Sequence, residues 1–177
     1  CQEDARLVPI GVCDPRQGGE AHVEYCQRMG FKLMAMFPDS QEWTLHSLSV
    51  RRTLQKIDEA KLPLLIEAGQ DGDATAIMDA TMGMTMPIIL LDVSLHTLSE
   101  TRDVIRERPN TYLSTRLLCG GDTIEMLVQS LGADRLIFTS RYPISCFSSA
   151  FLVAKYANIS DADRAKIMGD NMEALLG

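Results

Sequence analysis

The 177-residue sequence predicts an α/β protein with the plan of a parallel β/α barrel, incomplete and with about six strand-helix units. Compact apolar runs, which indicate strands, alternate with segments of helical spacing along the whole chain. The runs begin at intervals of roughly 25–30 residues, the length of one strand-helix unit. Because an eight-unit barrel typically needs about 250 residues, the chain is about two units short of closure. An open doubly wound sheet is the other arrangement that this pattern allows.

Six apolar runs bounded by Pro, Gly or Asp are predicted to form the strands. They lack the polar alternation of half-exposed strands, which is typical of parallel strands buried on both faces. In chain order they cover residues 6–12, 31–37, 62–68, 87–93, 111–117 and 135–140.

Helical spacing is clearest in two of the intervening segments, where apolar side chains recur every three or four residues. The residues that carry this spacing are Val50, Leu54 and Ile57 in one segment and Ile77, Ala80 and Met84 in the other. Near the end, Ser160 is expected to cap a final helix with Asp163 three residues on, and Ile159 to pack back against it. That end is expected to be complete, whereas the first strand has no helix before it and the start is expected to be abrupt.

Charge and composition disfavour several classes of function. The balance of 17 Lys and Arg against 24 Asp and Glu, a net charge of -7, argues against a nucleic-acid partner. No apolar run approaches the roughly 20 residues of a membrane span, and the first residues do not have the layout of a signal peptide. We therefore expect a cytoplasmic protein. The five cysteines form no CxxC pair, so they are expected to be reduced thiols, with Cys13 a buried side chain rather than a nucleophile.

The common nucleotide and hydrolase motifs are absent from the sequence. It contains no GxGxxG, no GxxxxGK[ST] and no GxSxG. The three histidines, His22, His46 and His96, form neither HxH nor HExxH, so no histidine-rich metal site is expected. The ten methionines are interpreted as adaptable core residues.

Several stretches together resemble the amidohydrolase-2 family of metal-dependent hydrolases and decarboxylases, whose members are (β/α)8 barrels. GADRLIFTSRYPIS (132–145) and ISDADRAKIMGDNMEALLG (159–177) resemble its closing strand, with a Gly-Ser-Asp-Tyr-Pro signature, and its terminal helix. The runs at 31–37, 62–68, 87–93 and 111–117 resemble its fourth to seventh strands, and RLVPIGVCDP resembles its third. The resemblance implies one domain over residues 1–177 that lacks the first two strands of the barrel.

The resemblance also implies where a site would lie and how it differs here. The family's HxH motif falls on the first strand, which has no counterpart in this sequence. The histidines expected after the fifth and sixth strands are replaced by Glu67 and Asp92, and the acid of the closing signature is replaced by Arg141. We hypothesise that Arg141 takes over the neutralising role of a metal by pairing with Glu67 and Asp92.

Simpler interpretations of the same residues stay open. Glu67 and Asp92 could cap helices or face solvent, as carboxylates at strand ends often do. Arg141 could lay its stem against Tyr142 on the surface. Asp39 is interpreted as a turn residue and His96 as a structural residue beside a helix.

For function, these substitutions predict a barrel without the family's metal site and without cofactor, which acts as a non-catalytic scaffold, binding or assembly protein. The alternative is a divergent hydrolase or carbon-carbon lyase that uses Glu67 or Asp92 as general base and Arg141 to hold an anionic substrate. Unpaired strand edges predict a homo-oligomer or a completing protein partner. A small anionic ligand is compatible with either function.

Overall fold

The computed structural model describes residue 4 and residues 7–177. Strand and helix alternate as the sequence predicts. The strands are β1 (Ile10–Cys13), β2 (Leu33–Met36), β3 (Leu64–Glu67), β4 (Ile88–Leu91), β5 (Thr111–Ser114) and β6 (Leu136–Ile137). The helices are η1 (Pro15–Gln17), α1 (Gly19–Arg28), α2 (Leu48–Glu59), α3 (Asp73–Ala80), α4 (Leu98–Glu107), α5 (Thr123–Leu131), η2 (Ala133–Arg135), α6 (Phe147–Tyr156), α7 (Asp161–Ala165), η3 (Lys166–Asp170) and α8 (Asn171–Leu176).

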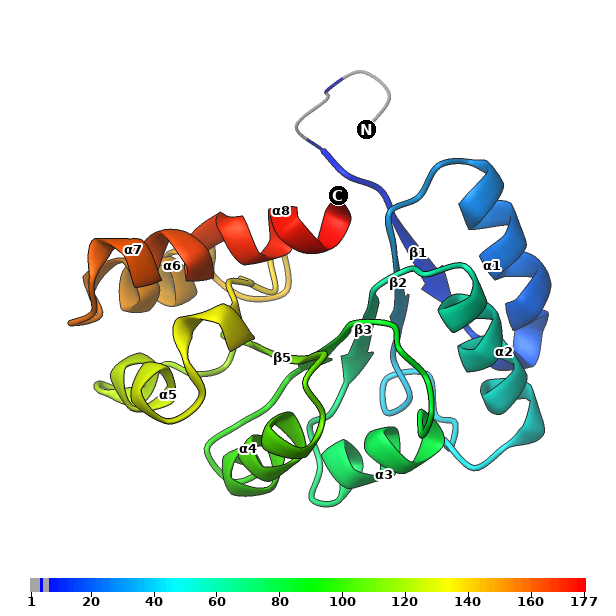
Figure 1. Ribbon diagram of the computed structural model, residues 1–177, viewed down its shortest axis with the longest axis horizontal. Helices are drawn as coiled ribbons and strands as arrows, with labels where there is room; N and C mark the ends of the chain where they lie inside the picture. Colours follow the sequence, from blue (N-terminus) through cyan, green and yellow to red (C-terminus); the bar gives the residue numbers. More distant parts are fainter. Residues whose placement is uncertain (1–3, 5–6) are drawn as a thin grey trace.

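The six strands form one parallel sheet in the order β1-β2-β3-β4-β5-β6. A doubly wound sheet reverses its strand order part of the way through, whereas a barrel adds each new strand on the same side. The sequential order therefore confirms an incomplete α/β barrel. In Figure 1 the units follow an open arc, with β1 and the C-terminal end of α8 on either side of the opening.

All six predicted strands are present, but each is shorter than its apolar run. The first, predicted over residues 6–12, starts later than predicted, because β1 begins at Ile10 directly after Pro9. Arg6 and Cys1 lie outside the described residues. Strand β6 keeps only two residues of the predicted 135–140, and the residues after it form the loop that carries Arg141.

Predicted helix positions are largely confirmed, except that α3 ends at Ala80 and leaves Met84 outside the helix. Val50, Leu54 and Ile57 are fully buried on α2, and the hydroxyl of Ser47 accepts the N–H of Val50 at 3.3 Å. Ser160 caps α7 in the same way, accepting the N–H of Asp163 at 3.1 Å. One correction concerns the final helix, which is not a continuous α-helix because η3 is a π-helical turn.

Two layers of apolar side chains hold the sheet. On its outer face, Met34, Met36, Leu64, Ile66 and Ile88 pack against the helices. On its inner face, Leu33, Ala35, Leu65, Ile89, Leu91 and Ile137 form a second cluster, against which Met172, Leu175 and Leu176 of the C-terminal helix pack. In a closed barrel, side chains from the strands alone fill this space. Here part of the filling comes from α8.

Candidate functional site

The C-terminal ends of the strands bring together three residues that the sequence singled out. Glu67 is the last residue of β3 and Asp92 directly follows β4, while Arg141 lies in the loop after β6. Parallel strands end at the same edge of the sheet, so residues far apart in sequence meet there. Glu67 and Asp92 are both buried, which argues against the simple solvent-facing interpretation.

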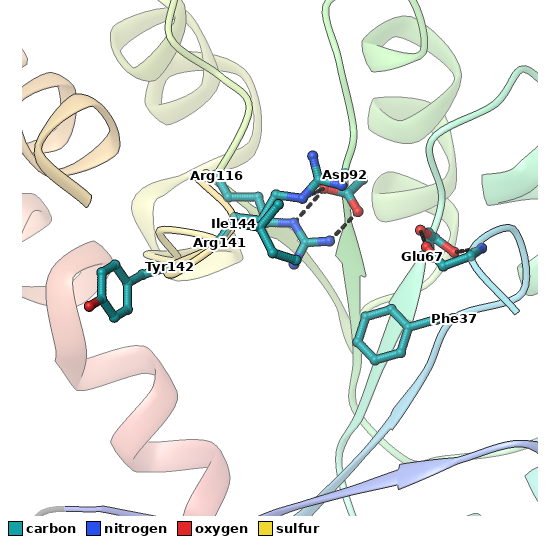
Figure 2. Close-up of a pocket in the computed structure, with 8 residues that line it drawn as sticks. Phe37, Glu67, Asp92, Arg116, Arg141, Tyr142 and Ile144 are labelled. Atoms are coloured by element: carbon teal, nitrogen blue, oxygen red, sulfur yellow. Dashed lines mark hydrogen bonds and ion pairs between the residues drawn. The ribbon is translucent and has the colours of Figure 1, made fainter. Parts of the chain in front are cut away.

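A pocket of about 290 Å³ occupies this end of the barrel. Its walls are Phe37, Ser40, Glu67, Asp92, Arg116, Arg141, Tyr142 and Ile144. Three of these side chains are large and apolar or aromatic, and four are charged. Figure 2 shows Arg116 and Arg141 pointing toward Asp92, with Glu67 and Phe37 on the other side of the pocket.

Asp92 is the centre of an ion-pair cluster. The guanidinium of Arg116 meets it at two points: Nε donates to Oδ1 at 2.6 Å, and Nη2 donates to Oδ2. Both side chains are largely buried, 12% exposed for Arg116 and 9% for Asp92. The Nε of Arg141 lies 3.6 Å from Oδ1 of the same carboxylate. One buried anion is thus shared by two cations.

Glu67 is held in a different way. The backbone N–H of Ser40 donates to its Oε2 at 2.8 Å, and the Ser40 hydroxyl donates to its Oε1 at 2.6 Å. Ser40 lies in the turn after β2, so Glu67 fastens a neighbouring loop. The hypothesis that Arg141 pairs with both acids is therefore confirmed for Asp92 and wrong for Glu67, whose hydrogen-bond donors among the described residues are both on Ser40.

Arg116 is the residue that sequence reasoning missed. It lies two residues beyond β5. The predicted strand 111–117 placed it inside a buried strand, so no role at the site was predicted for it. The strand in fact ends at Ser114. A charged residue near the end of an otherwise apolar run was the signal that could have revealed it, since burial of an arginine requires a partner.

The backbone at the cluster has an unusual conformation. Asp92 has φ of 59° and Arg141 has φ of 57°, both in the left-handed region that non-glycine residues seldom adopt. Such residues persist only where the surrounding structure determines them, and they concentrate at functional sites. Both members of this ion pair are therefore positioned at some cost in backbone energy.

Other candidates have simpler roles. Asp39 lies in the turn after β2, as predicted, and partial desolvation together with the charge of Glu67 raises its pKa. His96 is exposed before α4. Cys13 is buried against α1, and burial raises the pKa of its thiol to about 12.

The side chains around Asp92 do not fit the divalent metal that the resemblance implies. Arg116 occupies both Asp92 oxygens, and a cation placed there would meet two guanidinium groups. Both Glu67 oxygens accept from Ser40. Within residue 4 and residues 7–177, no three His, Cys, Asp or Glu side chains are grouped so as to hold a metal ion.

Fold and site together define an incomplete α/β barrel with an arginine-carboxylate cluster at the C-terminal ends of its strands. No protein-family model and no curated protein matches the sequence. Solved structures do match. The 2,6-dihydroxybenzoate decarboxylase from Rhizobium has a TM-score of 0.73 at 16% identity, covering 96% of this chain and 70% of its own.

Two further structures show the same likeness. An uncharacterized TIM-barrel protein from Bordetella bronchiseptica has a TM-score of 0.75 at 18% identity, over 96% of this chain and 66% of its own. An amidohydrolase from Mycobacterium avium subsp. paratuberculosis has a TM-score of 0.63 at 19% identity, over 96% and 57%. The likeness establishes the fold, and the amidohydrolase-2 resemblance noted in the sequence is confirmed at that level. Across the part of the chain that the structure describes, no helix is long and apolar enough to span a membrane.

Proposed function

We propose that this protein is a metal-independent, non-catalytic relative of the amidohydrolase barrels that binds a small anionic ligand in the Asp92 pocket. The observation that carries the proposal is the pairing of two guanidinium groups with one carboxylate. Arg116 binds both oxygens of Asp92, so the single negative charge of Asp92 does not neutralise both guanidinium groups. Arg141 therefore keeps positive charge that can bind an anion. In this proposal residues 1–177 form one domain that lacks two strands of the barrel.

Arg141 is the group that would bind the ligand. Its side chain is 33% exposed and it lines the pocket. Among the described residues, no hydrogen bond occupies its two terminal nitrogens. An arginine with free N–H groups beside a pocket can bind a carboxylate at two points.

The remaining walls indicate the shape of the ligand. Phe37, Tyr142 and Ile144 supply aromatic and apolar surface for a flat body. A volume of about 290 Å³ lies at the small end of the range of roughly 300–1,000 Å³ that is usual for ligand pockets. One structural neighbour is named for 2,6-dihydroxybenzoate, a small aromatic carboxylate. We propose a ligand of that size and charge.

The alternative, a divergent hydrolase or lyase, has less support. A general base must have a lone pair within reach of the proton that it takes from the substrate. Each oxygen of Glu67 already accepts one hydrogen bond from Ser40, and each oxygen of Asp92 accepts one from Arg116, so fewer lone pairs are available on either acid. Asp39 is a turn residue outside the pocket lining.

We also propose that the protein assembles with another chain, because the barrel is open. We propose a cytoplasmic location as well, because Cys13, Cys26, Cys119 and Cys146 are all free thiols.

Calorimetric titration tests the binding proposal, with benzoate as the probe, neutral benzamide as its isostere and a chelator present throughout. Benzoate should bind and benzamide should bind at least about tenfold more weakly, since a charged hydrogen bond contributes about 1.4 kcal/mol or more. Arg141→Gln should lower the affinity for benzoate about tenfold. Arg106→Gln, on the exposed face of α4, is the matched control and should leave it unchanged.

Activity is measured in the same preparation. Release of carbon dioxide from 2,6-dihydroxybenzoate should be absent, both with chelator and with added Mn²⁺. Turnover that depends on added metal would contradict the proposal, as would equal binding of benzoate and benzamide.

A further inference from the structure

A second pocket lies at the opposite end of the strands from Asp92. Its walls come from the end of α3, the turn that leads into β4 and the end of α4, which leads into β5. These segments lie at the amino ends of the strands, whereas Asp92 follows the carboxyl end of β4. The volume of about 440 Å³ is within the range of roughly 300–1,000 Å³ that is usual for ligand pockets. We call it the Arg108 pocket.

Three methionines, Met78, Met82 and Met84, supply apolar wall to the Arg108 pocket. Met78 and Met84 are half-buried and pack partly against the core. Met82 is 77% exposed, so it does not have the core role that was expected of the methionines. The thioether side chain is flexible and polarizable, and it is common at surfaces that adapt to apolar ligands.

Arg108, directly after α4, supplies positive charge at this pocket and is held firmly. Its Nη1 donates to the hydroxyl of Thr81 and, at 3.4 Å, to the Thr81 carbonyl, while Nη2 donates to the carbonyl of Met84 at 3.1 Å. Thr81 is buried, and its hydroxyl donates in turn to the carbonyl of Ile77 at 2.6 Å. The guanidinium is therefore in place before any ligand binds, which lowers the entropic cost of binding.

No acidic side chain neutralises Arg108 directly. In the described part of the chain, no carboxylate lies within ion-pair distance of its guanidinium. Asp58 acts on it from farther away and accepts from the backbone N–H groups of Thr85 and Met86, both at 2.8 Å. Desolvation lowers the pKa of Arg108, which is the direction expected for a half-buried cation without a close counter-ion.

Arg108 also has N–H groups that no protein group accepts. Among the described residues its Nε makes no hydrogen bond, and its Nη2 makes one of the two that it can donate. We infer that the Arg108 pocket binds a medium-chain aliphatic carboxylate, with the carboxylate on these N–H groups and the chain against the three methionines. A planar guanidinium can bind a carboxylate at two points. The inference is independent of the ligand proposed for the Asp92 pocket.

Glu107 limits the charge of the ligand. It is the last residue of α4, it is exposed, and it lines the pocket together with Arg108. A ligand with two or more negative charges, such as phosphate, would meet repulsion from this carboxylate. A single carboxylate with an apolar chain therefore suits the pocket better than phosphate does.

Calorimetric titration of the full chain with octanoate tests the inference. Octanoate should bind at least about tenfold more tightly than octanamide, its neutral isostere, because hydrogen bonds between charged groups are stronger than neutral ones. Butanoate, which has a shorter chain, should also bind at least about tenfold more weakly than octanoate because it buries less apolar surface. Inorganic phosphate should not compete with octanoate.

Variants locate the binding site. Arg108→Gln should lower the affinity for octanoate about tenfold, although it also removes hydrogen bonds to the turn before β4. Met82→Asp is the second variant, because it places a negative charge on the pocket wall at an exposed position, and it should lower the affinity severalfold. Met126→Asp, at a side chain that is 54% exposed on α5, is the matched control and should bind octanoate like the wild type.

NMR of the methionine methyl groups in the wild-type chain provides a measurement that does not depend on folding of a variant. Octanoate should shift the signals of Met78, Met82 and Met84, while those of the buried Met34 and Met36 should stay in place. Absence of saturable binding would overturn the inference, and so would octanamide that binds as tightly as octanoate. Binding that leaves the three signals unshifted, or that Met82→Asp does not weaken, would place octanoate elsewhere and overturn it as well.

Discussion

Arg116 and Asp92 form a two-point ion pair between the ends of β5 and β4, with the guanidinium and the carboxylate both largely buried. A third group, Arg141, shares the same carboxylate at 3.6 Å. The arrangement places a protein cation where a metal-binding barrel would need its ligands free. It also makes Arg116, rather than Arg141, the main partner of the buried acid.

Loss of Arg116 should therefore destabilise the fold strongly. Arg116→Ala leaves Asp92 buried with only the more distant Arg141, and breaking a buried pair on one side costs about 3–5 kcal/mol. Arg141→Ala should cost about 1 kcal/mol or less, because its side chain is partly exposed and its contact longer. Urea unfolding of both variants measures the two costs. Equal losses, or a larger one for Arg141→Ala, would refute this ranking.

Asp39, in the turn after β2, should make the free energy of unfolding depend on pH. Partial desolvation and the neighbouring Glu67 raise the pKa of Asp39, so the folded chain binds a proton there more tightly than the unfolded chain. The free energy of unfolding must then fall as pH rises from the ordinary aspartate pKa through the raised pKa of Asp39. The loss persists at all pH values above the raised pKa. Asp39→Asn should raise the melting temperature at neutral pH, with a smaller gain below the ordinary aspartate pKa.

The outcome is checked by thermal unfolding at a series of pH values. Asp103→Asn, at an exposed position on α4, serves as the control because its carboxylate lies beside Arg106 rather than beside other acids. A gain for Asp39→Asn that stays constant down to the lowest pH would contradict the assignment of the effect to Asp39 ionisation.

Asn171 should be important for attachment of the C-terminal helix. Its side-chain amide donates to the carbonyls of Ala133 at 2.8 Å and Leu136 at 2.9 Å, which ties η3 and α8 to β6. Asn171→Ala leaves both carbonyls without these donors, and we expect a loss of about 1–3 kcal/mol. Asn158→Ala is the matched control, since Asn158 is exposed and uses its backbone N–H to contact Glu125. If Asn171→Ala lowered the free energy of unfolding no more than Asn158→Ala does, the two hydrogen bonds of Asn171 would not be important for attachment of the helix.

The four described thiols should differ sharply in reactivity. Burial raises the pKa of Cys13 to about 12, so it should react slowly with a disulfide reagent. Cys146 is exposed ahead of α6, and the nearby backbone N–H groups of Ser148 and Ser149 lower its pKa. Cys146 should therefore react fastest and keep reacting at lower pH than an ordinary thiol.

Mass spectrometry of labelled peptides reads each site separately. Cys146→Ser should abolish the fastest phase, whereas Cys119→Ser, which removes another exposed thiol, should leave it in place. Rapid labelling of Cys13 in the folded chain would contradict the burial argument.

Several features of this protein follow from local sequence. Buried parallel strands need continuous apolar runs, so all six could be found by inspection, and Ser47 and Ser160 act within three residues of the helices that they begin. The positions of Glu67 and Asp92 at strand ends also follow from those runs. The pairing of Arg141 with Asp92 was predicted from the family resemblance and the opposite charges of the two side chains, whereas the buried Glu67 is held by Ser40 without a cation.

Only the tertiary structure decided which cation is the main partner, what holds Glu67 and what covers the inner face of the sheet. Ser40 and Glu67 are 27 positions apart, and Arg116 and Asp92 are 24 apart. Such contacts depend on where each strand stops, and apolar patterns locate strand ends only to within a few residues. The packing of α8 against the inner face had no local signal either. It arises because an open barrel exposes apolar side chains that a closed one would bury, and the nearest amphipathic helix of the chain covers most of them, with β1 left exposed.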